Sequence, residues 1–260
     1  MTDFLSVTES AGEFVSQEQV ERICNRYYWA GRYCAGKDVL EVACGTGQGL
    51  GYLSKLSKSL TAGDYSGEVL SITRSYYDDR INLKQFDAQQ MPFYDDSADV
   101  IIFFEAIYYL PSVKRFLSEC RRILRNGGHV LVATANKDLY DFNPSPYSYN
   151  YYGVTELCRM FSEFGFSTEF FGIMPVSEIS LRQRALRPIK KVAVKLNAIP
   201  KTMRFKKFFK RIVFGKLVTM PAEIKWGMVP YAEPVKISPD FPDKLHKVIY
   251  CAATLKKVDL

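Results

Sequence analysis

Glycines and carboxylates around the first apolar run of the chain have the types and spacing of a small-molecule binding site. Within DVLEVACGTGQGLGYL, residues 38–53, the apolar run gives way to four alternate glycines, Gly45, Gly47, Gly49 and Gly51. A strand that turns through glycines into a helix points free backbone N–H groups at a ligand, and the missing side chains let the ligand come close. A nicotinamide dinucleotide favours G-x-G-x-x-G, whereas the third glycine here comes one place early, so the spacing weakens that choice.

Three acidic residues extend this site along the following strands. Glu41 lies inside the first strand, four residues before Gly45, where its carboxylate can reach a ligand ammonium directly or through water. Asp64 ends the second strand and is placed to accept hydrogen bonds from two ribose hydroxyls. Asp87 follows the third strand in FDAQQMPF, where it can accept a hydrogen bond from an adenine amino group. A ligand that contains an amino acid, a ribose and an adenine satisfies all three.

The elements that must position these residues alternate along the chain. Between β-rich runs, apolar residues recur every three or four positions at 48–56, 66–77 and 112–124. This pattern predicts a parallel sheet with helices on both faces, and such sheets bind ligands beyond the carboxyl ends of their strands. For the third helix, Ser112 is the expected N-cap and Asn126–Gly128 the expected stop. A fourth helix is expected at 154–165, and the expected strands are 38–43, 59–64, 81–86, 98–104, 129–134, 166–173 and 246–257.

Positive charge is concentrated in one segment. The net charge is +7, from 35 Lys or Arg and 28 Asp or Glu. The segment Ile179–Ala222 holds 13 Lys or Arg and no acid, which leaves 22 basic against 28 acidic residues elsewhere. This segment interrupts the alternating pattern, which is typical of an insertion. We therefore expect a catalytic domain formed by residues 1–172 and 241–260, and a basic insertion at 173–240.

Several other classes of protein fit the sequence poorly. The six cysteines form no C-x-x-C pair, and the two histidines, His129 and His246, lie far apart, so no metal site is expected. The N-terminus has no basic flank and apolar core of a signal peptide, and no uncharged apolar run approaches the roughly 18 residues of a membrane span. We expect a cytoplasmic protein with reduced thiols.

Four motifs in order, VLEVACGTG, GDYS, FDAQQMPFYDDSADVI and CRRILRNGGHVLVAT, resemble those of class I S-adenosylmethionine-dependent methyltransferases of the type 11 group. The resemblance covers about residues 20–172 and the last strand. It implies a Rossmann-like sheet of seven strands, the last of them antiparallel, and S-adenosylmethionine as the cofactor. By position, Gly45 and Gly47 would hold the methionine part, Asp64 the ribose and Asp87 the adenine. The other implied cofactor-binding residues are Tyr27, Glu41, Ala43, Tyr65, Ala88 and Phe104.

The segment FFEAIYYLP after the fourth strand lies where an acceptor and the methyl group should meet. Glu105, Tyr108 and Tyr109 are therefore the candidate catalytic residues. Methyl transfer is an in-line displacement at an activated carbon, so a general base is needed only if the acceptor must lose a proton. Many relatives carry a histidine here and this chain does not, so Glu105 is expected either to hold the cofactor or to orient the acceptor. The two tyrosines contact the acceptor or simply form a wall.

Two segments bear on the acceptor. Five tyrosines between Tyr140 and Tyr152 form either an acceptor lid or an ordinary surface loop. Within the insertion, residues 203–218 predict an amphipathic helix with one cationic face, which can lie on an anionic membrane, grip phosphates or cap the domain. The insertion is similar to that of methyltransferases associated with bacterial cell-surface glycan synthesis. That similarity implies a small-molecule acceptor, or a sugar carried on a nucleotide or a lipid diphosphate, and peripheral association with the inner membrane surface.

Two other functions stay open. An RNA methyltransferase could use the basic segment to hold phosphates, but the sequence contains no RNA-binding module, so nucleic acid is not the expected partner. A non-catalytic module could retain the fold and lose the chemistry, because a fold does not imply a function.

Overall fold

The computed structural model describes residues 4–145, 147–177 and 217–257. The amphipathic helix expected at 203–218 lies, apart from its last two residues, outside the described residues. Among the helices that are described, none combines the length and the apolar character that a membrane span requires.

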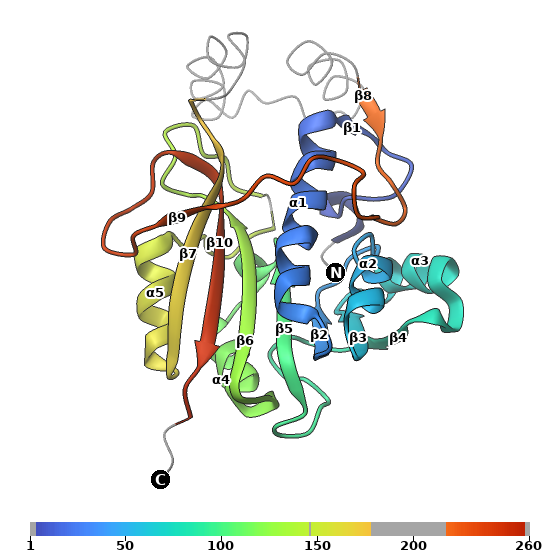
Figure 1. Cartoon of the computed structure of the whole chain (residues 1–260), viewed down its shortest axis with the longest axis horizontal. Coiled ribbons are helices and arrows are strands. Elements are labelled where there is room, and N and C mark those ends of the chain that lie inside the picture. The colour runs from blue at the N-terminus through green and yellow to red at the C-terminus, as the bar shows by residue number, and fades with distance from the viewer. Residues whose placement is uncertain (1–3, 146, 178–216, 258–260) are drawn as a thin grey trace.

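The central sheet is mixed and has eight strands in the described part of the chain (Figure 1). Its first five strands are parallel to one another, and β10 is antiparallel to both of its neighbours. In spatial order the strands are β4 (Asn82–Gln85), β3 (Ser59–Asp64), β2 (Asp38–Val42), β5 (Ala98–Phe104), β6 (Leu124–Ala135), β10 (His246–Leu255), β7 (Phe166–Pro175) and β9 (Val235–Ile237). The Rossmann-like arrangement and the antiparallel last strand are as predicted.

The predicted count of seven strands is wrong for the described residues. β9 pairs with the edge strand β7 in antiparallel register, with Ile237 opposite Phe170. An edge strand has unpaired backbone N–H and C=O groups, and a short extended segment that passes beside it can satisfy them. The eighth strand therefore comes from inside the segment predicted as an insertion.

Helices cover both faces of the sheet, as predicted. On one face, α4 (Val113–Ile123) packs against β5 and β6, with Phe116 on Phe103, and α5 (Val154–Glu163) packs against β7, with Phe161 on Phe166. On the opposite face lies α1 (Gln17–Cys34), whose Trp29 stacks on Tyr250 of β10 (Figure 1). The remaining helices are α2 (Leu50–Leu56), α3 (Gly67–Tyr77) and the 3₁₀ turns η1 (Phe4–Val7), η2 (Asp78–Arg80) and η3 (Ile107–Tyr109).

Helix α4 confirms the predicted start and corrects the predicted end. The Ser112 hydroxyl accepts a hydrogen bond from the Arg115 amide, as an N-cap does. The helix stops at Ile123, before the Asn126–Gly128 stop, because Leu124 is already paired with Ala98 of β5. Tertiary pairing thus overrides the local glycine signal. Gly127 does adopt a left-handed φ of 77°, but inside β6 rather than at the helix end.

The described end of the predicted insertion packs on the catalytic domain. β8 (Leu217–Thr219) pairs with β1 (Phe14–Ser16) in a separate two-stranded sheet. Further along, Met220, Ile224 and Val229 are buried in the same apolar cluster as α1. Residues 217–240 therefore contribute to the core, and the domain boundaries at 173 and 240 stay a prediction.

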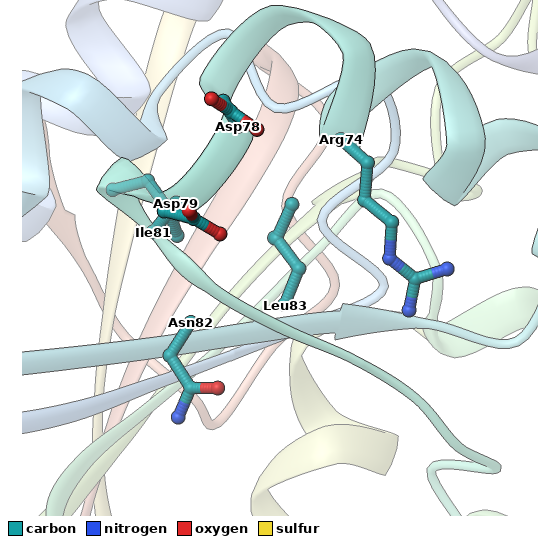
Figure 2. Close-up of a pocket in the computed structure, with 6 residues that line it drawn as sticks. All are labelled: Arg74, Asp78, Asp79, Ile81, Asn82 and Leu83. Atoms are coloured by element: carbon teal, nitrogen blue, oxygen red, sulfur yellow. The ribbon is translucent and has the colours of Figure 1, made fainter.

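A shallow hollow of about 490 Å³ lies at the corner of α3, η2 and β4 (Figure 2). Its side chains include Arg74, Asp78 and Asp79, and none of the predicted site residues lines it. It is set apart from the larger cavity in which the predicted site residues gather.

Candidate active site

A cavity of about 1080 Å³ lies beyond the carboxyl ends of the parallel strands. η1, α1 and the segments that follow β2, β3, β4 and β5 enclose it. All predicted site residues except Glu41 and Gly47 line this cavity, namely Tyr27, Ala43, Gly45, Asp64, Tyr65, Asp87, Ala88, Phe104, Glu105, Tyr108 and Tyr109. The structure thus brings together residues that are spread over more than 80 positions of the sequence.

The glycine loop owes its shape to contacts on both sides. Gly45 and Gly47 have left-handed φ values of 59° and 81°, which favour glycine. A Cβ at Gly47 would lie 2.6 Å from the Thr73 methyl carbon, so Gly47 serves close packing against α3. The Tyr77 hydroxyl donates a hydrogen bond of 2.7 Å to the Gly47 carbonyl, and the Thr73 hydroxyl donates one of 2.7 Å to the Gly45 carbonyl. Gly45 is therefore the glycine that presents its backbone to the cavity.

Asp64 links the loop after β2 to the loop after β3. One of its oxygens accepts a hydrogen bond of 3.0 Å from the Gly45 amide, and the other accepts one of 2.9 Å from the Ser66 amide. Burial raises the pKa of this carboxyl, although the two amides act to lower it. Each carboxylate oxygen keeps a second lone pair, so two ligand hydroxyls can still be bound.

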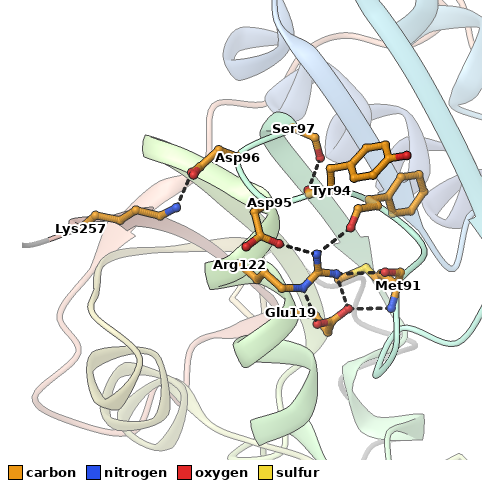
Figure 3. Close-up of polar contacts among 9 residues, drawn as sticks. Met91, Tyr94, Asp95, Asp96, Ser97, Glu119, Arg122 and Lys257 are labelled. Carbon is orange, nitrogen blue, oxygen red and sulfur yellow. Dashed lines mark hydrogen bonds and ion pairs between the residues drawn. The ribbon is translucent and has the colours of Figure 1, made fainter.

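The segment after Asp87 is fixed by Arg122 of α4 (Figure 3). The Arg122 guanidinium donates hydrogen bonds to the Met91 carbonyl at 3.0 Å and to the Phe93 carbonyl at 2.6 Å. It also pairs with Glu119, whose carboxylate accepts a hydrogen bond from the Met91 amide at 2.7 Å. A planar guanidinium can make all of these bonds at once, so Arg122 holds the segment that presents Asp87 to the cavity.

Glu41 lies one layer away from the cavity and contacts it through Tyr27. The Tyr27 hydroxyl donates a 2.5 Å hydrogen bond to Glu41 Oε1, while Oε2 is buried without a hydrogen-bond partner. Burial raises the pKa of Glu41 to about 7, although the Tyr27 hydrogen bond and the Arg26 charge act to lower it. The carboxyl and the Tyr27 ring thus form one buried unit behind the cofactor region.

A cluster of charges that sequence reasoning missed also lines the cavity. Arg22 and Arg26 lie one turn apart on α1, and Glu9 follows η1. Arg22 pairs with Glu9 at 2.5 Å, and Arg26 lies 3.5 Å from Glu105 and 4.0 Å from Glu9. The only signal in the sequence was the four-residue spacing of two arginines within ERICNRYYWA, next to the predicted Tyr27.

Comparisons with known proteins agree with this geometry. Residues 40–132 match a family described as a methyltransferase domain. Residues 40–132 thus form a methyltransferase domain, and the relatives that the chain resembles are S-adenosylmethionine-dependent methyltransferases. A probable S-adenosylmethionine-dependent methyltransferase of Mycolicibacterium smegmatis is 28% identical over 174 residues, 62% of this chain and 67% of the relative. One from Mycobacterium tuberculosis is 31% identical over 137 residues, 51% of this chain and 50% of the relative.

Two further matches concern a substrate class and the fold. A phthiotriol/phenolphthiotriol dimycocerosates methyltransferase of Mycobacterium ulcerans is 37% identical over 103 residues, 37% of this chain and 37% of the relative. The chain therefore spans from about two thirds to about one third of the length of these curated relatives. The crystal structure of the YcgJ protein from Bacillus subtilis superposes with a TM-score of 0.58 at 16% identity, over 90% of this chain and 99% of the other. At that identity the match shows the fold.

The residues that line the cavity fit S-adenosylmethionine, the cofactor of such methyltransferases. The Gly45 backbone approaches the cavity with no side chain in the way, and Asp64 and Asp87 present carboxylates at neighbouring strand ends. When bound, the cofactor supplies a methyl group on a positively charged sulfur. The chain would hold it through Gly45, Asp64 and Asp87, as the sequence resemblance implied.

Tyrosines form another wall of the same cavity. The Tyr108 hydroxyl donates to Glu105 Oε2 at 3.2 Å, and its ring stacks on Tyr151 at 4.2 Å between centroids. The hydroxyl of Tyr109 lies 2.7 Å from that of Ser145. From the predicted lid loop, Tyr147 and Tyr149 line the cavity. The loop is thus positioned beside the catalytic candidates, and its role as a lid stays a prediction.

The described residues contain no cluster of three or more His, Cys, Asp or Glu side chains that could hold a metal ion. Burial together with the Glu105 charge raises the pKa of the Tyr108 hydroxyl well above the ordinary value. Tyr108 is accordingly a hydrogen-bond donor at neutral pH.

Proposed function

We propose that the whole chain transfers the methyl group of S-adenosylmethionine to a small-molecule acceptor or to one attached to a nucleotide or lipid carrier. One observation carries this proposal: the glycine loop, Asp64, Asp87 and a wall of tyrosines share a single cavity of about 1080 Å³. A cavity of this size has room for a cofactor and part of a second molecule. Holding both in one enclosed place converts a bimolecular reaction into an intramolecular one and keeps water out.

The acceptor that we propose is a sugar of a cell-surface glycan intermediate. Tyr108, Tyr109, Tyr147 and Tyr149 offer flat apolar faces with hydroxyls at their edges, a combination that suits sugar rings. The 13 cations of Ile179–Ala222 supply charge for a diphosphate carrier. A mycobacterial relative is named as a methyltransferase of phthiotriol dimycocerosates, which are lipids, and this supports an acceptor that contains a lipid.

Calorimetry with S-adenosylhomocysteine tests the cofactor, with NAD as the control. We expect micromolar affinity for the former and none for the latter. Labelled S-adenosylmethionine is then offered together with nucleotide sugars and lipid-linked glycans. Absence of S-adenosylhomocysteine binding would refute the proposal. Binding without labelling of any acceptor in a cell extract would instead support a non-catalytic module.

We also propose that the chain works in the cytoplasm at the inner membrane surface, held there by the basic segment. A variant with Lys206, Lys207, Lys210 and Arg211 all replaced by Gln should no longer sediment with vesicles that contain anionic lipid. The unaltered chain should sediment with them at low salt. Equal sedimentation of both proteins would contradict membrane binding, and salt-sensitive retention on tRNA would favour the RNA alternative.

A further inference from the structure

Buried polar atoms without partners gather at one place in the described residues. An enclosed donor or acceptor that lacks a hydrogen bond costs about 1–3 kcal/mol, so a group of them marks a place where a ligand completes the structure. The side-chain atoms concerned are Arg22 Nε, Arg26 Nε, Arg26 Nη1, Glu41 Oε2, Glu105 Oε1 and Tyr250 Oη. They belong to the cavity or to residues that adjoin its charge cluster.

Arg26 is the most unusual member of this group. Its side chain is only 7% exposed and lines the cavity, yet within the described residues its guanidinium makes no hydrogen bond. The centroids of its ring neighbours, Tyr27 and Phe104, lie 5.7 and 5.5 Å from the guanidinium carbon, and neither residue accepts a hydrogen bond from it. A guanidinium has five N–H donors, and those of Arg26 are left for a ligand.

Glu105 is the anionic counterpart of Arg26. Its carboxylate is held on one side by the Tyr108 hydroxyl at 3.2 Å, while Oε1 lies 3.5 Å from Arg26 Nη1 without a hydrogen bond. Its backbone is fixed in a left-handed conformation by the bond from its amide to the Ala133 carbonyl at 2.8 Å. The backbone bond and the Tyr108 hydroxyl therefore place the carboxylate beside the guanidinium.

The charges of the cluster select the ligand. Arg22 and Glu9 neutralise each other at 2.5 Å, and Arg26 with Glu105 forms a second, looser pair. If a single anion bound, the enclosed cluster would carry an uncompensated negative charge, and if a single cation bound, it would carry an uncompensated positive charge. An uncompensated charge away from water costs free energy. A group that carries both charges leaves the cluster neutral. An α-amino acid end is such a group.

We propose that Arg26 and Glu105 form a receptor for the zwitterionic amino-acid end of S-adenosylmethionine, with Arg26 bound to the carboxylate and Glu105 to the ammonium. The inference rests on the proposed function. The position is suitable because β5 is paired with β2, with Phe103 opposite Val42, so Glu105 follows one strand end and Gly45 the neighbouring one. Glu105 is then a cofactor-binding residue, and Tyr108 and Tyr109 remain for the acceptor.

The test compares two ligands that differ only in the proposed contact. 5′-Methylthioadenosine has the adenine, ribose and thioether of S-adenosylhomocysteine but lacks its amino-acid end. Calorimetry is performed on the unaltered chain and on Arg26→Gln, Glu105→Gln and Arg26→Lys. Arg32→Gln is the matched control, because Arg32 lies on the same helix and points outward to pair with Glu233.

Arg26→Gln and Glu105→Gln should each weaken S-adenosylhomocysteine binding by about 10-fold to 100-fold, the range for hydrogen bonds to charged groups. Binding of 5′-methylthioadenosine should stay within about twofold, which also shows that the variants are folded. Arg26→Lys should recover part of the loss, and the control should change neither affinity. Equal loss for both ligands, or no loss for either, would overturn the receptor while leaving the proposed function intact. An unaltered chain that binds neither ligand would overturn both.

Discussion

The substitution Glu41→Gln should remove a pH-dependent loss of stability. The pKa of Glu41 in the folded chain is about 7, against an ordinary value of 4.5. Between these values the folded chain keeps a proton that the unfolded chain has released, so the free energy of unfolding falls as the pH rises from about 4.5 to about 7. A shift of about 2.5 units corresponds to about 3 kcal/mol, all of it lost above pH 7. Glutamine has the same shape and no proton to release.

Urea unfolding at pH 5 and pH 8, followed by circular dichroism, measures this effect. The difference in stability between Glu41→Gln and the unaltered chain should be about 2–3 kcal/mol more favourable to the variant at pH 8 than at pH 5. Any cost of an unpaired amide N–H is the same at both pH values and cancels. Glu163→Gln is the control, since the Glu163 side chain is 44% exposed on α5. A difference between Glu41→Gln and the unaltered chain that is equal at both pH values would refute the reasoning.

Three further results are expected. Gly47→Ala should destabilise the chain by about 3 kcal/mol and Gly127→Ala by about 1 kcal/mol, because both glycines have a left-handed backbone but only at Gly47 does a neighbouring side chain crowd the added Cβ. Equal losses of stability in urea unfolding would contradict this explanation. Arg122→Lys cannot reproduce the hydrogen bonds to the Met91 and Phe93 carbonyls, so amide hydrogen exchange of residues 91–95 should become about fivefold faster. Unchanged exchange would show that this segment keeps its conformation without Arg122. Asp64→Ala should lower S-adenosylhomocysteine affinity by about 2 kcal/mol in calorimetry, and an unchanged affinity would remove Asp64 from the site.

The parallel half of the fold could be predicted because its signals are local. Each of its strands is a short β-rich stretch between helical patterns, and Asp64 ends one of them while Asp87 lies just beyond the next. Since carboxyl ends of parallel strands meet at one edge, knowing the strands was enough to place both carboxylates in one cavity. The same logic placed Gly45 and Glu105 there.

Features that depend on contacts between distant segments could not be predicted. β9 has only three residues, Val235–Ile237, and becomes a strand because β7 has an open edge beside it. Arg26 gives no sign of burial in the sequence, since arginine is usually exposed. Arg26 is buried because α1 packs over β5 and because Glu9, from the N-terminal segment, lies beside its guanidinium. A cavity wall made from three segments leaves no pattern in any one of them.

Two residues that follow strands at the edge of the cavity have a strained backbone. Ala43 after β2 and Glu105 after β5 both have positive φ, 55° and 52°, which is unfavourable by roughly 1–2 kcal/mol for a residue with a side chain. Glycine would relieve this strain at either position. At Glu105, however, glycine would also remove the carboxylate that faces Arg26 at 3.5 Å and would leave a buried cation without its nearest partner. The strained residue at the end of β5 is therefore explained by the chemistry of its side chain, because the backbone alone would favour glycine there.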